Sequence, residues 1–180
     1  MTRGGIVLSW GGGILVVAAG CQGDWQLAGG GGKAATAELY LPRRIEILPF
    51  TKVRSFDDDA IPDGIEVVLR PIDSLGDAIK TYGQYHFEVY EYRKGSAQRK
   101  GERVGFWQVG VGTMADQRRF WDRITRTYQF RLSWDRPLQP GRKYVLQVTY
   151  WPPSGKRLFA EHVLEFRLAA EQIRQVLPGR

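Results

Sequence analysis

The chain has few of the residues on which catalysis usually depends. Its 180 residues include two histidines and one cysteine, and no His or Cys pair has the spacing of a zinc site. No serine lies in a G-x-S-x-G nucleophile elbow, and there is no glycine-rich phosphate-binding loop. His162 falls on the apolar face of its stretch, whereas His86 falls on the polar side, with Glu88 two residues later. These absences favour a protein without enzymatic activity.

Long apolar runs and disulfide bonds are also lacking. Residues 6–19 are largely apolar but are interrupted by glycines, and the run is shorter than the ~20 residues that a membrane-spanning helix needs. A lone cysteine, Cys21, provides no disulfide, so the packing of a core must stabilise the fold. The chain is long enough for one domain with such a core.

The N-terminal residues have the three-part layout of a secretory signal peptide: Arg3, the apolar run, and small residues before Cys21. The sequence Ala18-Ala19-Gly20-Cys21 resembles the lipobox of bacterial lipoproteins, although Leu is commonest where Ala18 stands. The resemblance implies that residues 1–20 are removed and that Cys21 is acylated, which anchors the chain to a membrane. It also implies that no thiol remains for nucleophilic or metal chemistry.

The residue after the cysteine bears on the membrane to which the chain is attached. In bacterial lipoproteins, Asp at this position tends to retain the protein in the inner membrane, and this chain has Gln22 instead. The resemblance therefore implies a cell-envelope location, in the periplasmic or surface leaflet of the outer membrane where the cell has two membranes. It covers the leader alone and implies no activity.

The composition is basic, with a formal net charge of +7 at pH 7 and a pI of about 9.7. For an exported protein we expect an envelope protein, anionic lipid or wall polysaccharide as partner, and no nucleic acid. The basic residues form one group in an expected hairpin loop and another around an expected helical turn: Arg93, Lys94, Arg99, Lys100 and Arg103, then Arg118, Arg119, Arg123 and Arg126. If the two groups share a face, they favour anionic lipid or wall polymer; the alternative is that they are solvated loop charges.

Two segments with different patterns follow the leader. Residues 21–37 are rich in Gly and Ala and predict a flexible tether. Residues 38–169 contain seven or eight runs of alternating apolar and polar side chains, separated by turns with Pro and Gly. This pattern predicts an all-β domain, a single antiparallel β-sandwich.

The boundaries of some elements can also be predicted. Strands are expected over residues 104–111 and 124–134, and short helices over residues 114–121 and 169–177. Residues 170–180 are expected to be a short helical or disordered tail.

The end of the domain resembles known β-sandwiches. The segment LQPGRKYVLQVTYWPPSGK is similar to the closing hairpin of immunoglobulin-like and fibronectin-type-III-like modules. The likeness implies a sandwich of that kind. From Ile45 onward the chain resembles an uncharacterised family of small bacterial lipoproteins, which implies no activity.

An acidic stretch provides a candidate metal site. It has oxygen donors at the ligand positions of an EF-hand-type calcium loop, which are Ser55, Asp57, Asp59, the Ile61 carbonyl, Asp63 and Glu66. The core DDDAIPDG also resembles the calcium repeats of thrombospondin type 3. Ala60 stands where such a loop has its turn glycine, and no helix is expected on either side. The alternative is a solvated acidic turn shaped by Pro62 and Gly64.

Aromatic side chains provide a candidate contact surface. Trp134 follows the inward period of its strand, which predicts a core position. Tyr90, Tyr92 and Trp151 fall on faces expected to point outward, where they would stack on a sugar or contact a partner protein.

These features together predict a lipid-anchored envelope protein whose β-sandwich is a non-catalytic binding or structural module without a resident cofactor. One alternative is a carbohydrate-binding module stabilised by calcium. Another is a hydrolase of wall or surface polymer, which requires a cleft holding two carboxylates or a His–Glu pair such as His86 and Glu88.

Overall fold

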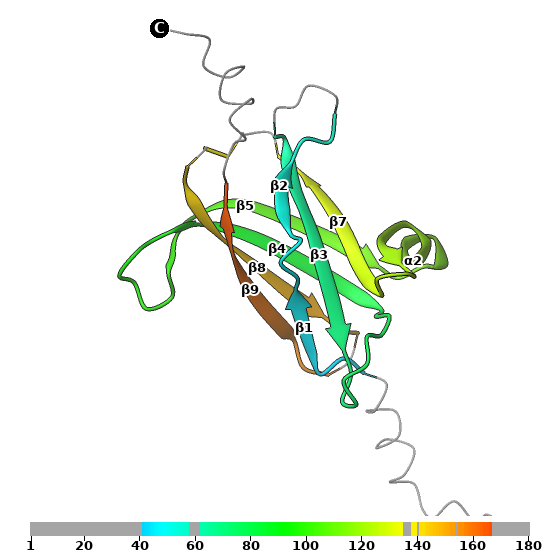
Figure 1. Cartoon of the computed structure of the whole chain (residues 1–180). Helices are drawn as coiled ribbons and strands as arrows, with labels where there is room; N and C mark the ends of the chain where they lie inside the picture. The colour runs from blue at the N-terminus through cyan, green and yellow to red at the C-terminus, as the bar shows by residue number, and fades with distance from the viewer. Residues whose placement is uncertain (1–40, 58–61, 135–137, 140, 154, 167–180) are drawn as a thin grey trace, which may run out of the picture.

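The strands of the protein form two antiparallel sheets that pack face to face (Figure 1). The computed structural model describes residues 41–57, 62–134, 138–139, 141–153 and 155–166. The predicted signal peptide, Cys21, the predicted tether and the C-terminal tail with its expected helix lie outside the described residues. In chain order the elements are β1 (Arg44–Ile47), β2 (Lys52–Arg54), β3 (Gly64–Ile72), β4 (Gly83–Tyr92), β5 (Lys100–Val111), α2 (Met114–Phe120), β6 (Trp121–Asp122), β7 (Thr127–Ser133), β8 (Lys143–Trp151) and β9 (Leu158–Glu165).

The strand order agrees with the predicted sandwich. The five-stranded sheet has the order β1-β3-β7-β6, with β2 also paired to β3, and the four-stranded sheet has the order β5-β4-β8-β9. If β1, β3, β7 and β6 are labelled A, B, E and D, and β5, β4, β8 and β9 are labelled C′, C, F and G, the strand order matches that of immunoglobulin-like sandwiches. The described chain therefore confirms an all-β, two-sheet antiparallel architecture.

The core lies between the two sheets and is filled by every second residue of the central strands. Tyr85, Phe87 and Val89 of β4 are fully buried, as the alternation of apolar residues predicts. The rings of Tyr85 and Phe130, from opposite sheets, lie 5.2 Å apart between centroids. The other large side chains that are almost completely buried include Ile65, Val67, Leu69, Val111, Tyr128, Leu132, Leu146, Val148 and Tyr150.

Tyr144 links the start of the hairpin formed by β8 and β9 to the segment that precedes it. It lies at the start of β8, and its hydroxyl oxygen accepts a hydrogen bond from the backbone N–H of Gln139 at 3.0 Å. A tyrosine in this place, bonded to backbone a few residues upstream, is the tyrosine corner of immunoglobulin-like sandwiches. Strands β8 and β9 then pair without a shift in register from Lys143↔Glu165 to Tyr150↔Leu158.

Two predicted strand boundaries are wrong. The strand expected over residues 124–134 begins only at Thr127, because Asp122 Oδ1 accepts hydrogen bonds from the backbone N–H groups of Ile124 and Thr125 at 2.8 and 3.4 Å and closes a turn. Arg126 completes this turn with a positive φ of 54°. The strand expected over residues 104–111 begins earlier, at Lys100.

The helix expected over residues 114–121 is present as α2. Its N-terminus has a capping box in which the Thr113 side chain accepts from the Asp116 backbone and the Asp116 carboxylate accepts from the Thr113 backbone. Among the described residues, none of the helices has the length and apolar character required to cross a membrane.

Candidate functional site

The outer face of the four-stranded sheet carries aromatic side chains in solvent. His86, Phe106, Trp151 and Phe159, which we call the aromatic face, come from all four strands of this sheet. The His86 ring lies 5.7 Å from that of Phe106 and 5.4 Å from that of Trp151. His86, Thr149 and Phe159 share one cross-strand row, and 72% of Phe159 is exposed. Sheet pairing thus gathers aromatic residues that are far apart in sequence.

A row of charged and amide side chains adjoins the aromatic residues. One carboxylate oxygen of Glu88 accepts a hydrogen bond from Arg103 Nη1 at 2.9 Å, and the other accepts one from Gln147 Nε2 at 3.0 Å. Lys100 donates to Gln147 Oε1 at 2.5 Å and forms an ion pair with Glu161. The carboxylates and cations in this row balance one another, so the centre of the face has little net charge.

Tyr90 lies within this charged row rather than apart from it. Its ring is 5.4 Å from Lys100 Nζ, a cation–π distance. Partial burial, followed by a hydrogen bond to Glu88, raises the pKa of the Tyr90 hydroxyl. Tyr90 is half-buried, so it contributes to a contact surface mainly through its edge.

His86 occupies the middle of the aromatic face, between Phe106 and Trp151. Its Nε2 atom is buried and has no hydrogen-bond partner in the described part of the chain. Trp151 also contacts Arg157, whose guanidinium lies 4.0 Å from the centroid of the Trp151 ring. The face therefore combines fixed aromatic rings with a polar nitrogen that an incoming group can reach only by displacing its neighbours.

A groove of about 410 Å³ lies at one end of the aromatic face. Its walls include Tyr82, which is 62% exposed, and Trp151. Gly110 forms part of the lining, and a Cβ atom built on Gly110 would have no heavy atom within 4 Å. The lining is mostly aromatic, aliphatic and backbone, which is the usual character of a small-ligand pocket.

The structure places the three predicted contact aromatics on the outward faces. Trp151 lies in both the aromatic face and the groove, whereas Tyr90 and Tyr92 are half-buried beside Lys100. Sequence reasoning missed Phe106 and Phe159. Alternation would have identified Phe159, because Leu158, Ala160 and His162 occupy the opposite face of its strand.

The acidic stretch is only partly described, and several of its donors are already engaged. Ser55 Oγ bonds to the Asp57 carbonyl at 2.8 Å, Asp63 Oδ1 accepts from the Phe56 N–H at 2.8 Å, and Glu66 is paired with Arg54 at 2.9 Å. The other two predicted ligands, Asp59 and Ile61, lie outside the described residues. In the described ranges no three His, Cys, Asp or Glu side chains are grouped to hold a metal ion.

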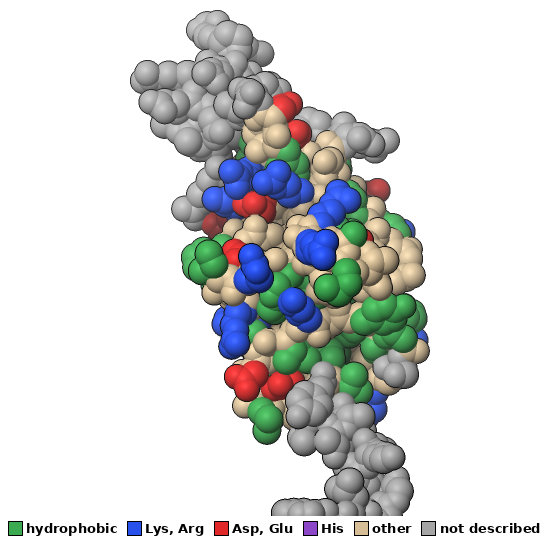
Figure 2. Space-filling model, turned by 90° about the vertical axis from the view of Figure 1, so that its right-hand side faces the viewer, with side chains coloured by type: hydrophobic (Ala, Val, Ile, Leu, Met, Phe, Trp, Pro, Cys, Tyr) green, Lys and Arg blue, Asp and Glu red, His purple; other side chains and the backbone are tan. Residues whose placement is uncertain are grey.

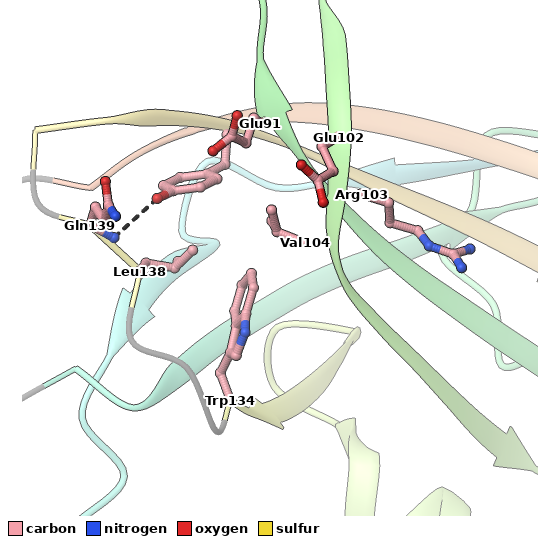
Figure 3. A pocket seen from close by; sticks show the side chains of 8 residues that line it. Glu91, Glu102, Arg103, Val104, Trp134, Leu138 and Gln139 are labelled. Carbon is pink, nitrogen blue, oxygen red and sulfur yellow. Dashed lines mark hydrogen bonds between the residues drawn. The ribbon is translucent and has the colours of Figure 1, made fainter.

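Two carboxylates share a small pocket at the bulged end of the four-stranded sheet (Figure 3). Glu91 and Glu102 come from β4 and β5, and Trp134 rises from the other side of this space of about 210 Å³. Glu91 is paired with Arg142 at 3.2 Å, and the Tyr144 hydroxyl on the wall is bonded to Gln139. The other candidate pair, His86 and Glu88, lies on the outer face of the four-stranded sheet and lines neither this pocket nor the groove beside Trp151.

The sequence predicted that the first basic group lies in one hairpin loop, and this prediction is wrong. Arg93, Lys94 and Arg99 lie in the hairpin connection, but Lys100 and Arg103 belong to β5 and are paired with Glu161 and Glu88.

Comparisons with family models, with curated protein sequences and with solved structures found no match for this chain.

Proposed function

We propose that the chain is a lipid-anchored cell-envelope protein whose sandwich domain is a non-catalytic binding module, with the aromatic face as its contact surface. The observation that carries the proposal is the exposure of Phe106, Trp151 and Phe159 together on one sheet face. Large apolar side chains clustered on a surface are typical of interaction sites.

The polar row supports the same function. Glu88 with Arg103, and Lys100 with Glu161, are already paired before any partner arrives. A partner that covers these pairs does not have to neutralise an unbalanced charge. Aromatic anchors beside satisfied polar groups resemble the core and rim of protein interfaces.

The anchor follows from the leader sequence. Acylation of Cys21 in the lipobox-like motif would hold the domain at an envelope membrane, and residues 22–37 would supply a reach of roughly 20 Å for a flexible coil. An envelope protein or a surface polysaccharide is then within range.

A second candidate, carbohydrate binding, is favoured by the groove between Tyr82 and Trp151. Exposed aromatic rings offer apolar faces on which a sugar ring can stack, and the volume of about 410 Å³ is within the usual range for a small-ligand site. This candidate does not require calcium at the groove, because Glu66 of the acidic stretch lies on the five-stranded sheet whereas Trp151 lies on the four-stranded sheet.

Site-specific photo-crosslinking in cells tests the proposal. A photoreactive phenylalanine at Phe159 is expected to give a discrete adduct, whether the partner is protein or polysaccharide. Leu75 is the matched control, because it is also 72% exposed but lies outside the aromatic face. Equal adducts from both positions, or none from Phe159 and Phe106, would contradict the proposal.

A further inference from the structure

The outer face of the five-stranded sheet is basic. Together with α2 it carries six cationic side chains, which we call the basic face: Arg44, Lys52, Arg54, Arg70, Arg119 and Arg131. Lys and Arg predominate in the middle of the side of the molecule that bears β7 and α2 (Figure 2). The cations come from four strands and one helix spread over residues 44–131, so only the fold brings them together.

The carboxylates on this face do not balance its cations. Glu46 pairs with Arg44 at 3.0 Å and with Arg70 at 3.6 Å, and Glu66 pairs with Arg54. Among the described residues, Lys52, Arg119 and Arg131 form no ion pair. The basic face therefore differs from the charged row of the aromatic face, in which each cation has a carboxylate.

Two of the unpaired arginines meet at one place. Arg119 from α2 and Arg131 from β7 line a hollow of about 290 Å³ together with Phe120 and Gln129. The Arg119 guanidinium lies 5.1 Å from the Phe120 ring centroid, and that of Arg131 lies 5.9 Å from the Phe56 ring centroid. Both guanidinium groups are thus within cation–π distance of a ring, and both arginines are exposed to solvent. Two such groups suit an oxyanion with several acceptor oxygens, above all a phosphate.

The turn that leads into β7 adds an apolar side chain beside further cations. Ile124 is 93% exposed and stands between Arg123 and Arg126. Burying a single aliphatic side chain among basic residues is typical of proteins that rest on an anionic membrane surface.

We propose that the basic face docks on anionic phospholipid head groups, with one lipid phosphate in the hollow between Arg119 and Arg131. The inference rests on the proposed lipid anchor, because acylation of Cys21 would keep the domain within a short distance of a bilayer. The basic face and the aromatic face are the outer surfaces of the two packed sheets and lie on opposite sides of the sandwich. Docking through the five-stranded sheet therefore leaves the aromatic face directed away from the membrane and open to a partner.

Vesicle binding tests the proposal on the full chain with Cys21→Ser, which removes the acyl anchor and makes the result independent of the proposed lipidation. Sedimentation with vesicles of phosphatidylglycerol and phosphatidylcholine is compared with sedimentation with phosphatidylcholine alone. Arg119→Gln with Arg131→Gln is expected to lower the partition onto anionic vesicles by about 10- to 30-fold. The matched control is Arg93→Gln with Lys94→Gln, which removes the same charge from the hairpin connection and is expected to cost less than about 3-fold.

Three outcomes would overturn the docking proposal. Equal losses from the two double variants would show that only net charge matters. Equal partition onto neutral and anionic vesicles would show that the leader, rather than the basic face, binds lipid. Displacement of the chain by inorganic phosphate at the same concentration as the lipid phosphate would assign the hollow to a soluble ligand. None of these results depends on the aromatic face, whose test is the crosslink at Phe159.

Discussion

The ring of Trp151 lies 5.4 Å from the imidazole of His86, on the side of the four-stranded sheet that faces away from the core. Both residues are at positions where a sheet exposed to water usually carries small polar side chains. The core does not need them, since Tyr85, Phe87 and Tyr150 fill the inner face of the same two strands. Their arrangement is consistent with the proposed contact surface, because the core is filled without them.

On the four-stranded sheet, we expect the inward side chains to determine stability and the outward aromatic side chains to contribute little to it. Phe159→Ser is expected to change the free energy of unfolding by less than about 0.5 kcal/mol, because the side chain is mostly in solvent. Phe87→Ala should cost about 3–5 kcal/mol, because it leaves a cavity in the core. Urea denaturation measures both. A cost for Phe159→Ser close to that of Phe87→Ala would show that Phe159 serves the fold.

The tyrosine corner makes a second prediction. Tyr144→Phe removes the oxygen that accepts the Gln139 N–H, and we expect a loss of about 1 kcal/mol in the free energy of unfolding. Tyr92→Phe is the control, since no hydrogen bond of the Tyr92 hydroxyl is described. Equal stability of the two variants would argue against a structural role for the corner.

Two glycines of the groove should respond differently to alanine. Gly83 has φ +153°, and a Cβ there would lie 2.4 Å from the Trp151 carbonyl oxygen, so Gly83→Ala should cost about 2 kcal/mol or more. Gly110→Ala meets no atom within 4 Å and should change stability by about 0.5 kcal/mol at most. Thermal unfolding of the two variants tests this prediction. A larger loss of stability for Gly110→Ala than for Gly83→Ala would refute the described backbone at this end of the sheet.

Gly110 also allows a test of carbohydrate binding, because a larger side chain there fills the groove without removing Tyr82 or Trp151. Gly110→Val is expected to reduce co-sedimentation with insoluble cell-wall polysaccharide, whereas Leu75→Val leaves it unchanged. A wild-type chain that stays in the supernatant would rule out this polysaccharide as the ligand.

The capping box of α2 predicts a dependence on pH. Hydrogen bonds from the Thr113 side chain and from the backbone N–H groups of Gly112 and Thr113 hold the pKa of Asp116 below its ordinary value of 3.8. The carboxylate therefore stabilises the folded state above that value, and the contribution is lost as the pH falls through the lowered pKa. Asp116→Asn should be less stable than the wild type at pH 7, and the difference should shrink in acid. A difference that is constant with pH would exclude this origin.

We expect calcium to leave the melting temperature unchanged. Asp63 and Glu66 already bond to Phe56 and Arg54, so a metal ion would have to compete with these partners. Melting in EDTA and in millimolar calcium tests this expectation. A rise with calcium that disappears in the Asp57→Ala, Asp59→Ala double variant would instead establish a metal site.

Alternation alone predicted much of this fold, because a half-buried strand repeats every two residues and the core positions of β4, β7 and β8 do so without interruption. It failed where local hydrogen bonds interrupt the pattern, as Asp122 does before β7, and where a strand is as short as β2. The sequence could mark Trp151 as outward. It could not bring Arg119 and Arg131 to one hollow or place His86 beside Phe106, because the packing of α2 sets the first pair and strand pairing sets the second.

Both proposals require the domain to be held at a membrane, so the most direct test is mass spectrometry of the N-terminal peptide of the mature protein from the membrane fraction. The account predicts that this peptide begins at Cys21 and carries the mass of acyl chains, and that Cys21→Ser moves the protein out of the detergent phase. A mature protein that begins elsewhere, or that lacks acyl mass and partitions into the aqueous phase, would contradict it.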